Sequence, residues 1–310
     1  MRDTFSSAII ADIANDPKAV FLTGDLGFNA LESVQLAFGE RFINAGIAEQ
    51  NMVGVAAGLA SSGQKPWVYS IATFMVFRPF EQIRNDICLH DLPVVLVGNG
   101  GGFGYGVMGP THHALEDYGS LGTLPNLRIL VPAFDEDVPA MVTIAHLSKK
   151  PVYLRLGFDR GPDVPSRPLE YAPWRCLIDG APGGPMVAVA GPIAGLVWGW
   201  CLSEPQKGIS LWVAGELPVP NVPPPEKFQQ AAQAASGLLT VEEHVRPGGF
   251  GEGLISYLAL AGALPDRPRI MAVPKDRITE YGDQLYCLSL CGLDQETFRS
   301  ELSAISGDIT

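Results

Sequence analysis

The sequence predicts an α/β protein of two consecutive domains, each built on a parallel sheet. The 310 residues suffice for two domains of roughly 100–200 residues each. Short, continuously apolar segments alternate with segments of helical period, a pattern typical of parallel strands covered by helices on both faces. A proline-rich stretch interrupts this alternation in mid-chain. We therefore expect domains over residues 1–160 and 185–310, joined by a linker over residues 161–184.

In the first domain, helical and strand patterns follow each other closely. Phe5, Ile9 and Ile13 repeat at helical spacing, which predicts a helix over residues 2–15. Gly24 ends the first apolar strand, and a glycine-rich loop over residues 98–109 follows the fourth. The expected strands are 19–23, 42–45, 67–70, 92–97, 127–131 and 152–156, and the further helices are 48–60, 74–89 and 136–147.

The linker prediction rests on Pro162 and four further prolines, because proline ends helices and strands alike. After it the α/β pattern returns in a second, smaller domain. Residues 218–225 are a proline-rich connection that we expect to be a rigid loop. The expected strands of this domain are 187–190, 210–213, 238–241 and 270–273, with helices between them.

Composition excludes several classes of partner. Acidic residues outnumber basic ones, 33 to 21, and the formal net charge is −12, whereas nucleic acids and anionic membranes require a basic face. The uncharged segment 183–202 could suggest a membrane span, but Pro185, Pro192 and its glycines favour a buried strand, turn and helix. Five widely spaced cysteines form no metal-binding motif, and we expect reduced thiols in a cytoplasmic protein.

Two segments of the first domain suit the binding of a flat heterocycle. Glu49 stands in the first turn of a predicted helix among apolar residues. It either stabilises the helix dipole or presents a carboxyl shielded from water. Phe74, Phe77 and Phe80 are spaced three apart, so they form either part of the core or an aromatic wall against a ligand. Spacing alone does not choose between these interpretations.

The glycine-rich loop ends in the pattern Gly-x-Gly-x-x-Gly over residues 104–109. Pro110 and Thr111 follow where the helix of a dinucleotide-binding site should begin, so we favour a flexible loop that covers a ligand. His112 and His113 come next, and a loop after a parallel strand is well placed to face a ligand. A capping or surface role for either histidine is the alternative.

Together and in this order, these segments resemble the C-terminal half of transketolase, and most of all the separate C-terminal subunit of split transketolases. They are also similar to deoxyxylulose-phosphate synthase. The resemblance covers most of the chain and implies a pyrimidine-binding transketolase-like domain over residues 1–160 and a transketolase C-terminal-like domain over residues 185–310. The segments that carry it are 24–26, 44–51, 70–80, 109–112, 240–244 and 248–252.

The transketolase family binds thiamine diphosphate between domains of two different chains. The resemblance implies that Glu49 bonds N1′ of the aminopyrimidine and shares a proton with it, and that Asp25 lies beside the cofactor. The three phenylalanines named above match the positions that pack on the pyrimidine. His112 matches a histidine that contacts substrate oxygen and assists proton transfer. The implied reaction moves a two-carbon ketol unit from a ketose donor to an aldehyde acceptor.

The family's Gly-Asp-Gly motif and the downstream Asn, which hold the diphosphate and Mg²⁺, are not found in this sequence. The resemblance therefore implies a separate N-terminal transketolase subunit that carries the diphosphate and the metal. Because the pyrimidine domains of this family pair across a two-fold axis, we expect an α2β2 assembly. We expect the second domain to be structural and dimerising. Glu242, Glu243 and His244 are either functional residues or solvated loop residues at a strand end, and the sequence does not choose between the two.

The substrate end departs from the pattern of sugar-phosphate transketolases. Met108 stands where the family has an acid, Phe158 where it has an arginine for the acceptor phosphate, and Asn29 near its usual serine, while Arg2 remains at a phosphate-contacting position. Fewer charge-assisted contacts to phosphate predict a substrate that is less phosphorylated or more apolar than a pentose phosphate. Two alternatives stay open: the β subunit of a 2-oxo acid decarboxylating, acyl-transferring thiamine diphosphate enzyme, and a non-catalytic scaffold paralogue.

Overall fold

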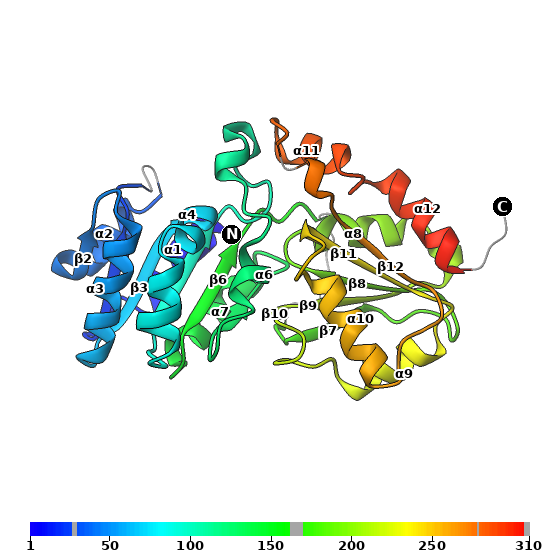
Figure 1. Cartoon of the computed structure of the whole chain (residues 1–310), viewed down its shortest axis with the longest axis horizontal. Helices are drawn as coiled ribbons and strands as arrows, with labels where there is room; N and C mark the ends of the chain where they lie inside the picture. The colour runs from blue at the N-terminus through cyan, green and yellow to red at the C-terminus, as the bar shows by residue number, and fades with distance from the viewer. Residues whose placement is uncertain (27–29, 162–169, 278, 307–310) are drawn as a thin grey trace.

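The chain folds into two α/β units that lie side by side (Figure 1). The computed structural model describes residues 1–26, 30–161, 170–277 and 279–306. Asn29, which we expect at the substrate end, lies outside the described residues. We refer to residues 1–161 as the N-terminal unit and to residues 170–306 as the C-terminal unit.

The first sheet has seven strands in the order β10-β5-β6-β4-β3-β1-β2. Strands β1 to β6 pair in parallel. The edge strand β10, Glu216–Leu217, comes from the C-terminal unit and pairs antiparallel with β5. The other strands are β1 Ala19–Thr23, β2 Phe42–Asn44, β3 Lys65–Ile71, β4 Val95–Asn99, β5 Arg128–Leu130 and β6 Val152–Leu156.

Helices cover both faces of the first sheet, as the continuous apolar strands require. In β1, Leu22 belongs to the same buried cluster as Met52 of α3, whereas its neighbour Phe21 packs with Phe5 of α1 and Met141 of α7 in the opposite cluster. The helices of this unit are α1 Arg2–Asp12, α2 Glu32–Phe38, α3 Glu49–Ser61, α4 Ala72–Phe77, α5 Phe80–Gln82, α6 Asp117–Leu121 and α7 Asp137–Leu147.

The helix that we expect over residues 74–89 is interrupted. Helix α4 ends at Phe77, α5 begins at Phe80 after Pro79, and a π-helical turn follows over Ile83–Cys88. Proline has no N–H to continue the α-helical hydrogen bonds, which explains the break at this point. Because of the break, Phe74, Phe77 and Phe80 do not share one continuous helical stripe.

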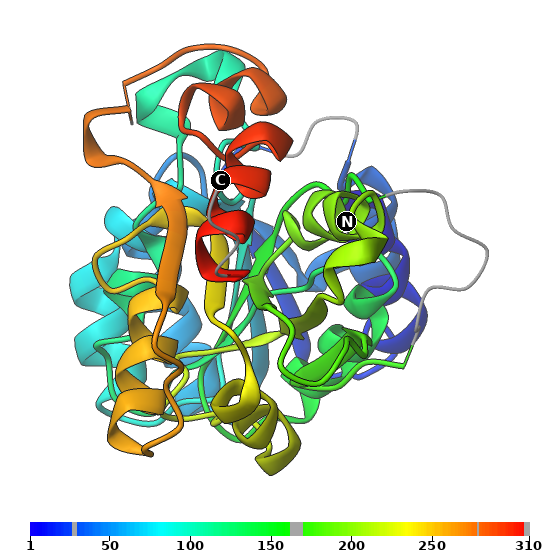
Figure 2. The same ribbon diagram turned by 90° about the vertical axis from the view of Figure 1, so that its right-hand side faces the viewer.

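The second sheet has five strands in the order β12-β11-β8-β9-β7. Its helices α8 and α12 belong to one buried cluster and α9 and α10 to another, so both faces are covered here too; Figure 2 shows α12 in front of the sheet. The elements are β7 Trp174–Ile178, β8 Met186–Ala190, α8 Ala194–Leu202, β9 Ser210–Ala214, α9 Glu226–Ala234, β11 Leu238–Val245, α10 Phe250–Leu260, β12 Pro268–Val273, α11 Gln284–Leu290 and α12 Gln295–Ser306.

One detail of the predicted fold is corrected here. The segment 161–184, expected to be a linker, contains β7, which pairs antiparallel with β9. With β10, it gives each parallel sheet one antiparallel edge strand, an arrangement common in large α/β sheets. Trp174–Ile178 lies between Pro173 and Pro182 without containing proline, so the prolines bound the strand and do not exclude it.

The two units share their apolar cores. One buried cluster continues from Leu22 through Tyr118 and Leu121 of α6 to Phe228 and Phe250 of the C-terminal unit. The exact division of the chain into two domains therefore stays a prediction. Among the described residues, no helix is long and apolar enough to span a bilayer, and all five cysteines are free thiols.

Candidate active site

Glu49 is the first residue of α3, and its carboxylate is held in a buried position, 3% exposed. Ser70, near the end of the adjacent strand β3, donates its hydroxyl hydrogen bond to Oε1 (3.1 Å). The Nη1 of Arg78, just after α4, donates to Oε1 at 2.9 Å and to Oε2 at 2.8 Å. Three elements thus meet at one carboxylate. The Arg78 cation compensates its negative charge, and the hydrogen bonds from Arg78 and Ser70 fix its orientation.

Arg78 connects Glu49 to His112, which follows the glycine-rich loop. Its guanidinium carbon lies 3.7 Å from the ring centroid of Phe74, a distance typical of cation–π contact. The Phe74 ring in turn meets the His112 ring edge-on, with 5.0 Å between centroids. Glu49, Arg78, Phe74 and His112 therefore form one contiguous row, although they come from separate parts of the chain.

An open cavity of about 720 Å³ lies beside Glu49, lined by residues 47–51 and Arg78. Gly24, at the end of β1, lies close to the Glu49 carboxylate. A Cβ at position 24 would lie 3.3 Å from the Gly46 carbonyl oxygen and 3.7 Å from Glu49 Oε1. The glycine therefore lets the end of β1 approach the carboxylate closely. A flat ring with a hydrogen-bonding edge fits this arrangement of an open space beside a buried carboxylate.

Asp25 follows the end of β1, with its carboxylate held by Asn44. The Asp25 N–H donates to Asn44 Oδ1 (3.0 Å), and Asn44 Nδ2 donates to Asp25 Oδ1 (3.0 Å). Asp25 has a φ of +41°, a conformation that Asp adopts more readily than most residues. It lines a separate cavity of about 220 Å³ with Asn44 and Phe42. The structure therefore places Asp25 near the Glu49 cavity but not in its wall.

The three phenylalanines do not form one wall. Phe74 contacts Arg78 and His112, Phe77 is 42% exposed, and Phe80 packs partly buried against the core on the α3 side. The core interpretation of this motif therefore applies to Phe80, and the ligand-wall interpretation is not tested by these contacts. The roles of all three toward a cofactor stay predictions, as do those of Glu49, Asp25 and His112.

The residues of the predicted substrate end lie at the surface. Met108 is 54% and Phe158 45% exposed. Arg2 is exposed and pairs with Asp3 at 3.1 Å. Arg160, two residues after Phe158, donates from Nε to Gln284 Oε1 (2.7 Å) in the C-terminal unit. Two positions that the resemblance assigns to the substrate end therefore carry exposed apolar side chains, and Arg160 is engaged with Gln284.

The Gly-x-Gly-x-x-Gly pattern has a packing explanation. The C-terminal unit lies on it: the Gly282 N–H donates to the Gly106 carbonyl at 3.3 Å, next to the start of α11 (Figure 1). A Cβ at Gly106 would come within 2.5 Å of the Gly282 oxygen, and one at Gly109 would overlap the Tyr281 ring. These glycines allow the two units to approach, and no nucleotide-binding helix starts at them.

Of the two interpretations of residues 242–244, the one that treats them as solvated loop residues is wrong. Strand β11 is longer than predicted and runs to Val245, with all its residues buried, because α6 and the glycine-rich loop of the N-terminal unit cover its end. Glu242 accepts hydrogen bonds from the Tyr118 hydroxyl (2.6 Å) and from two backbone N–H groups at the start of α10. Desolvation raises the pKa of Glu242 to about 7.

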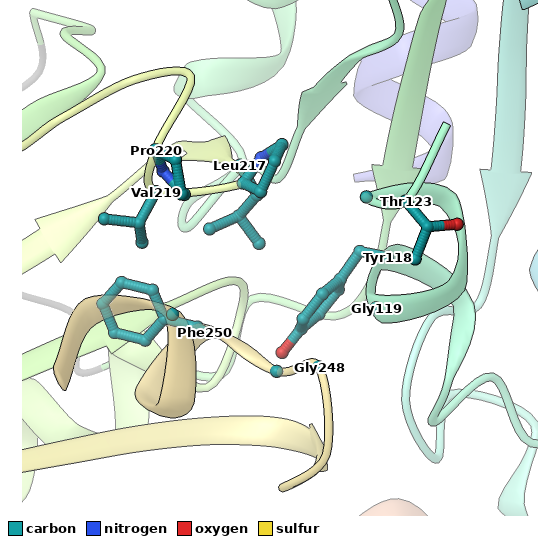
Figure 3. Close-up of a pocket in the computed structure, with 12 residues that line it drawn as sticks. Tyr118, Gly119, Thr123, Leu217, Val219, Pro220, Gly248 and Phe250 are labelled. Atoms are coloured by element: carbon teal, nitrogen blue, oxygen red, sulfur yellow. The ribbon is translucent and has the colours of Figure 1, made fainter. Parts of the chain in front are cut away.

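His244 is buried in the same interface and stacks on Tyr118 at 3.8 Å between ring centroids. Its Nδ1–H donates to the Val245 carbonyl (2.7 Å), and its Nε2 accepts from the Gly119 N–H (3.2 Å). This pattern requires the neutral imidazole. Burial lowers the pKa of His244 to about 4. Beside these groups, an apolar cavity of about 240 Å³ opens between Tyr118, Leu217 and Phe250 (Figure 3).

We expect His244→Gln to change how stability depends on pH. The ordinary pKa of histidine is 6.5, and that of His244 in the folded chain is about 4. Between these two pH values, His244 is therefore protonated in the unfolded chain but neutral in the folded chain. The stability contributed by the neutral ring is therefore present above pH 6.5 and lost as the pH falls toward 4. At pH 7 the variant should have a lower free energy of unfolding than the native chain. This difference should shrink by about 3 kcal/mol between pH 7 and pH 4.

Urea unfolding at several pH values measures this difference. Exposed His90→Gln is the matched control. A deficit of His244→Gln that stays constant with pH would contradict the assignment of a neutral, buried His244.

The fold and the site together define a transketolase-type protein. Residues 1–158 match the family described as "Transketolase, pyrimidine binding domain", and the chain belongs to this family. Along nearly its whole length it is similar to an apulose-4-phosphate transketolase subunit of Phocaeicola vulgatus, with 31% identity over 95% of this chain and 94% of that one. The predicted resemblance to a split transketolase subunit is thereby confirmed.

Two further relatives agree. The 1-deoxy-D-xylulose-5-phosphate synthase of Clostridium perfringens (strain SM101) is 27% identical over 96% of this chain, which spans 48% of that protein's length. A solved structure described as "Split gene transketolase, inactive beta4 tetramer" is 28% identical, with a TM-score of 0.80 over 99% of this chain and 96% of that one. The predicted fold class of two consecutive α/β domains is confirmed.

The sequence-based prediction missed three residues of the site. Arg78, Ser70 and Asn44 hold the carboxylates of Glu49 and Asp25, yet none of them was expected to do so. All three stand inside segments that carried the resemblance. A polar residue at the end of a predicted parallel strand is the signal that could have identified Ser70 and Asn44.

Proposed function

We propose that this chain is the pyrimidine-binding, catalytic-base subunit of a two-subunit thiamine diphosphate-dependent transketolase. The observation that carries the proposal is the buried Glu49 carboxylate at the first turn of α3, oriented by Ser70 and Arg78 and facing an open cavity. A carboxylate that is fixed and shielded from water can exchange a proton with a ring nitrogen placed beside it. Family membership and the whole-length match to a subunit of another transketolase support the same conclusion.

The side chains of the row suggest a division of work. Glu49 would bond N1′ of the aminopyrimidine. The Phe74 ring would present an apolar surface to the aminopyrimidine ring. When bound, thiamine diphosphate supplies an electron sink for cleavage of a carbon–carbon bond. His112, on the other side of Phe74, would contact the substrate oxygen and transfer a proton at an imidazole nitrogen. The Thr111 hydroxyl lies 2.9 Å from His112 Nδ1 and so helps to set the ring's orientation.

The diphosphate and Mg²⁺ are assigned to a separate subunit. Among the described residues, no group of three His, Cys, Asp or Glu side chains is placed to hold a metal ion, and the sequence contains no Gly-Asp-Gly. A solved relative is described as an inactive tetramer of β chains. We propose that this chain is likewise inactive alone and works in an α2β2 assembly in the cytoplasm.

Reconstitution tests the proposed function. The purified chain is mixed with a candidate N-terminal subunit that carries the Gly-Asp-Gly motif, together with thiamine diphosphate, Mg²⁺, hydroxypyruvate and an aldehyde acceptor. We expect ketol transfer only when both chains are present. Turnover by the chain alone would contradict the shared site, and turnover of pyruvate in place of hydroxypyruvate would favour a 2-oxo acid enzyme.

We further propose an acceptor that is less phosphorylated than a pentose phosphate, because Met108 and Phe158, at positions that the resemblance assigns to the substrate end, present exposed apolar side chains. Phe158→Arg should then raise kcat/KM for a phosphorylated acceptor relative to its unphosphorylated analogue by about 10- to 100-fold, the value of one hydrogen bond to a charged group. The charge-matched control is Leu260→Arg, at an exposed position of α10. Equal ratios in the two variants would contradict a phosphate-contacting position at residue 158.

A further inference from the structure

The base of the loop that carries His112 is anchored in the C-terminal unit. Gly102 and Ala114 close the loop with a pair of backbone hydrogen bonds of 2.9 and 3.0 Å. Beside this base, Phe103 and Leu115 are fully buried in the apolar cluster of the C-terminal unit. The Val245 N–H donates to the Leu115 carbonyl (2.8 Å). Both segments of the loop base are therefore held by residues that are distant in the sequence.

The polar part of this anchor is Glu243, in β11, which is 2% exposed. Its Oε1 accepts the Phe103 N–H at 2.8 Å. Gln284 Nε2 donates to both carboxylate oxygens at 3.0 Å, and Arg160 Nε donates to Gln284 Oε1 at 2.7 Å. The order Arg160–Gln284–Glu243–Phe103 is a continuous chain of hydrogen bonds that ends at the loop base, and its members orient one another.

The contact between the loop base and Glu243 requires a glycine at position 102. Its φ of +69° belongs to the left-handed region, and a Cβ there would overlap the carboxyl group of Glu243. Arg155, also buried, donates from Nη2 to the Ala114 carbonyl (2.9 Å) and to the Glu243 carbonyl (3.2 Å). The loop base is thus fitted around Glu243 on one side and held by Arg155 on the other.

On the basis of the proposed function, we propose that Glu243 is a positioning residue that sets the place of His112 through the base of the loop over residues 102–114. It acts through the Phe103 N–H and the Gly102–Ala114 pair. The C-terminal unit then contributes to catalysis by fixing the histidine-bearing loop against Phe74. Precise placement of a proton-transferring group is worth large rate factors.

The test uses Glu243→Gln and the exchange variant Glu243→Gln/Gln284→Glu. In the single variant, the amide at position 243 must turn its NH₂ donor toward either the Gln284 Nε2–H₂ group or the Phe103 N–H, which are both donors, so the chain of hydrogen bonds breaks. In the exchange variant, the amide at position 243 can accept from Phe103 and donate to the carboxylate at position 284, which can accept from Arg160. Net charge is the same in the exchange variant as in the native chain. Exposed Glu226→Gln in α9 is the matched control.

The first measurement is amide hydrogen exchange on the purified chain, which needs no partner. We expect exchange at Phe103 to be about 10- to 100-fold faster in Glu243→Gln, the equivalent of one charged hydrogen bond, and to return to the native rate in the exchange variant. Amides of β3, an interior strand of the first sheet, report whether the whole fold has loosened. Unchanged exchange at Phe103 in the single variant would overturn the proposal.

The second measurement is the activity of the reconstituted pair. We expect a kcat at least about tenfold lower in Glu243→Gln, with an unchanged concentration of thiamine diphosphate for half-saturation and with recovery in the exchange variant. Faster exchange at Phe103 without loss of kcat, or a loss that the exchange variant does not recover, would overturn the positioning role. A native pair without any turnover would instead contradict the proposed function, while hydrogen exchange still decides whether Glu243 holds the loop.

Discussion

Replacing Glu49 with Gln is expected to lower the kcat of the reconstituted enzyme by about 10²- to 10⁴-fold, the usual contribution of a proton-transferring group. The amide oxygen introduced at position 49 can still accept a hydrogen bond from Ser70 or Arg78, so the start of α3 should keep its shape. What the variant loses is the ability to exchange a proton. The large effect is expected because the carboxylate is buried and faces the open cavity at this place.

The decisive comparison for Glu49 is with Glu40→Gln, an exposed substitution of the same chemistry in the N-terminal unit. The two variants should unfold at similar temperatures, and only Glu49→Gln should lose turnover. A turnover of Glu49→Gln equal to that of the native pair would show that the proton assignment is wrong. Loss of turnover together with loss of the folded state would instead point to a structural role for the carboxylate.

Replacing Arg155 with Met is expected to lower the free energy of unfolding by about 3–5 kcal/mol, the cost of leaving a buried partner charge uncompensated. Arg155 is 1% and Asp117 0% exposed. The guanidinium donates from Nε to Asp117 Oδ2 at 2.8 Å, and the Tyr153 hydroxyl donates to the same oxygen at 2.8 Å. Without Arg155, Asp117 would lose the cation that compensates its charge in an apolar interior.

Denaturant unfolding measures this effect, and Lys227→Met serves as its control. Lys227 pairs with Asp179 at 3.2 Å, but the two side chains are 66% and 76% exposed, and substitutions of exposed pairs usually change stability by less than about 1 kcal/mol. The double variant Arg155→Met/Asp117→Asn should recover part of the loss, because the unpaired charge is removed. A loss below about 1 kcal/mol for Arg155→Met would contradict the interpretation that this pair is desolvated.

The interface between the two units gives the C-terminal unit a direct connection to the candidate site. Arg155 bonds the base of the His112 loop and the backbone of Glu243, and Gly282 packs on Gly106. Variants in this interface should therefore change the candidate site as well as stability. A C-terminal unit that served only for dimerisation would not need these contacts.

Much of the fold could be predicted because its signals are local. The continuous apolar run of residues 19–23 identified β1, and the same signal identified β8 and β9. Strand β7 was missed because the prolines around it dominate the local pattern of the segment. Strand β10 was missed because two residues, Glu216 and Leu217, carry no periodic signal, and they form a strand only against β5 of the other unit.

The sequence by itself determined the alternation of strands and helices, the start of α3 close to Glu49 and the family resemblance, since these depend on residue order and on side-chain pattern. The tertiary structure alone decided that Arg78 pairs with Glu49, that Phe74 lies between Arg78 and His112, and that residues 242–244 are buried. The physical reason is that burial and hydrogen-bond partnership depend on surfaces brought together from distant parts of the chain. A local pattern shows which groups can be buried, but only the packed neighbour decides whether they are.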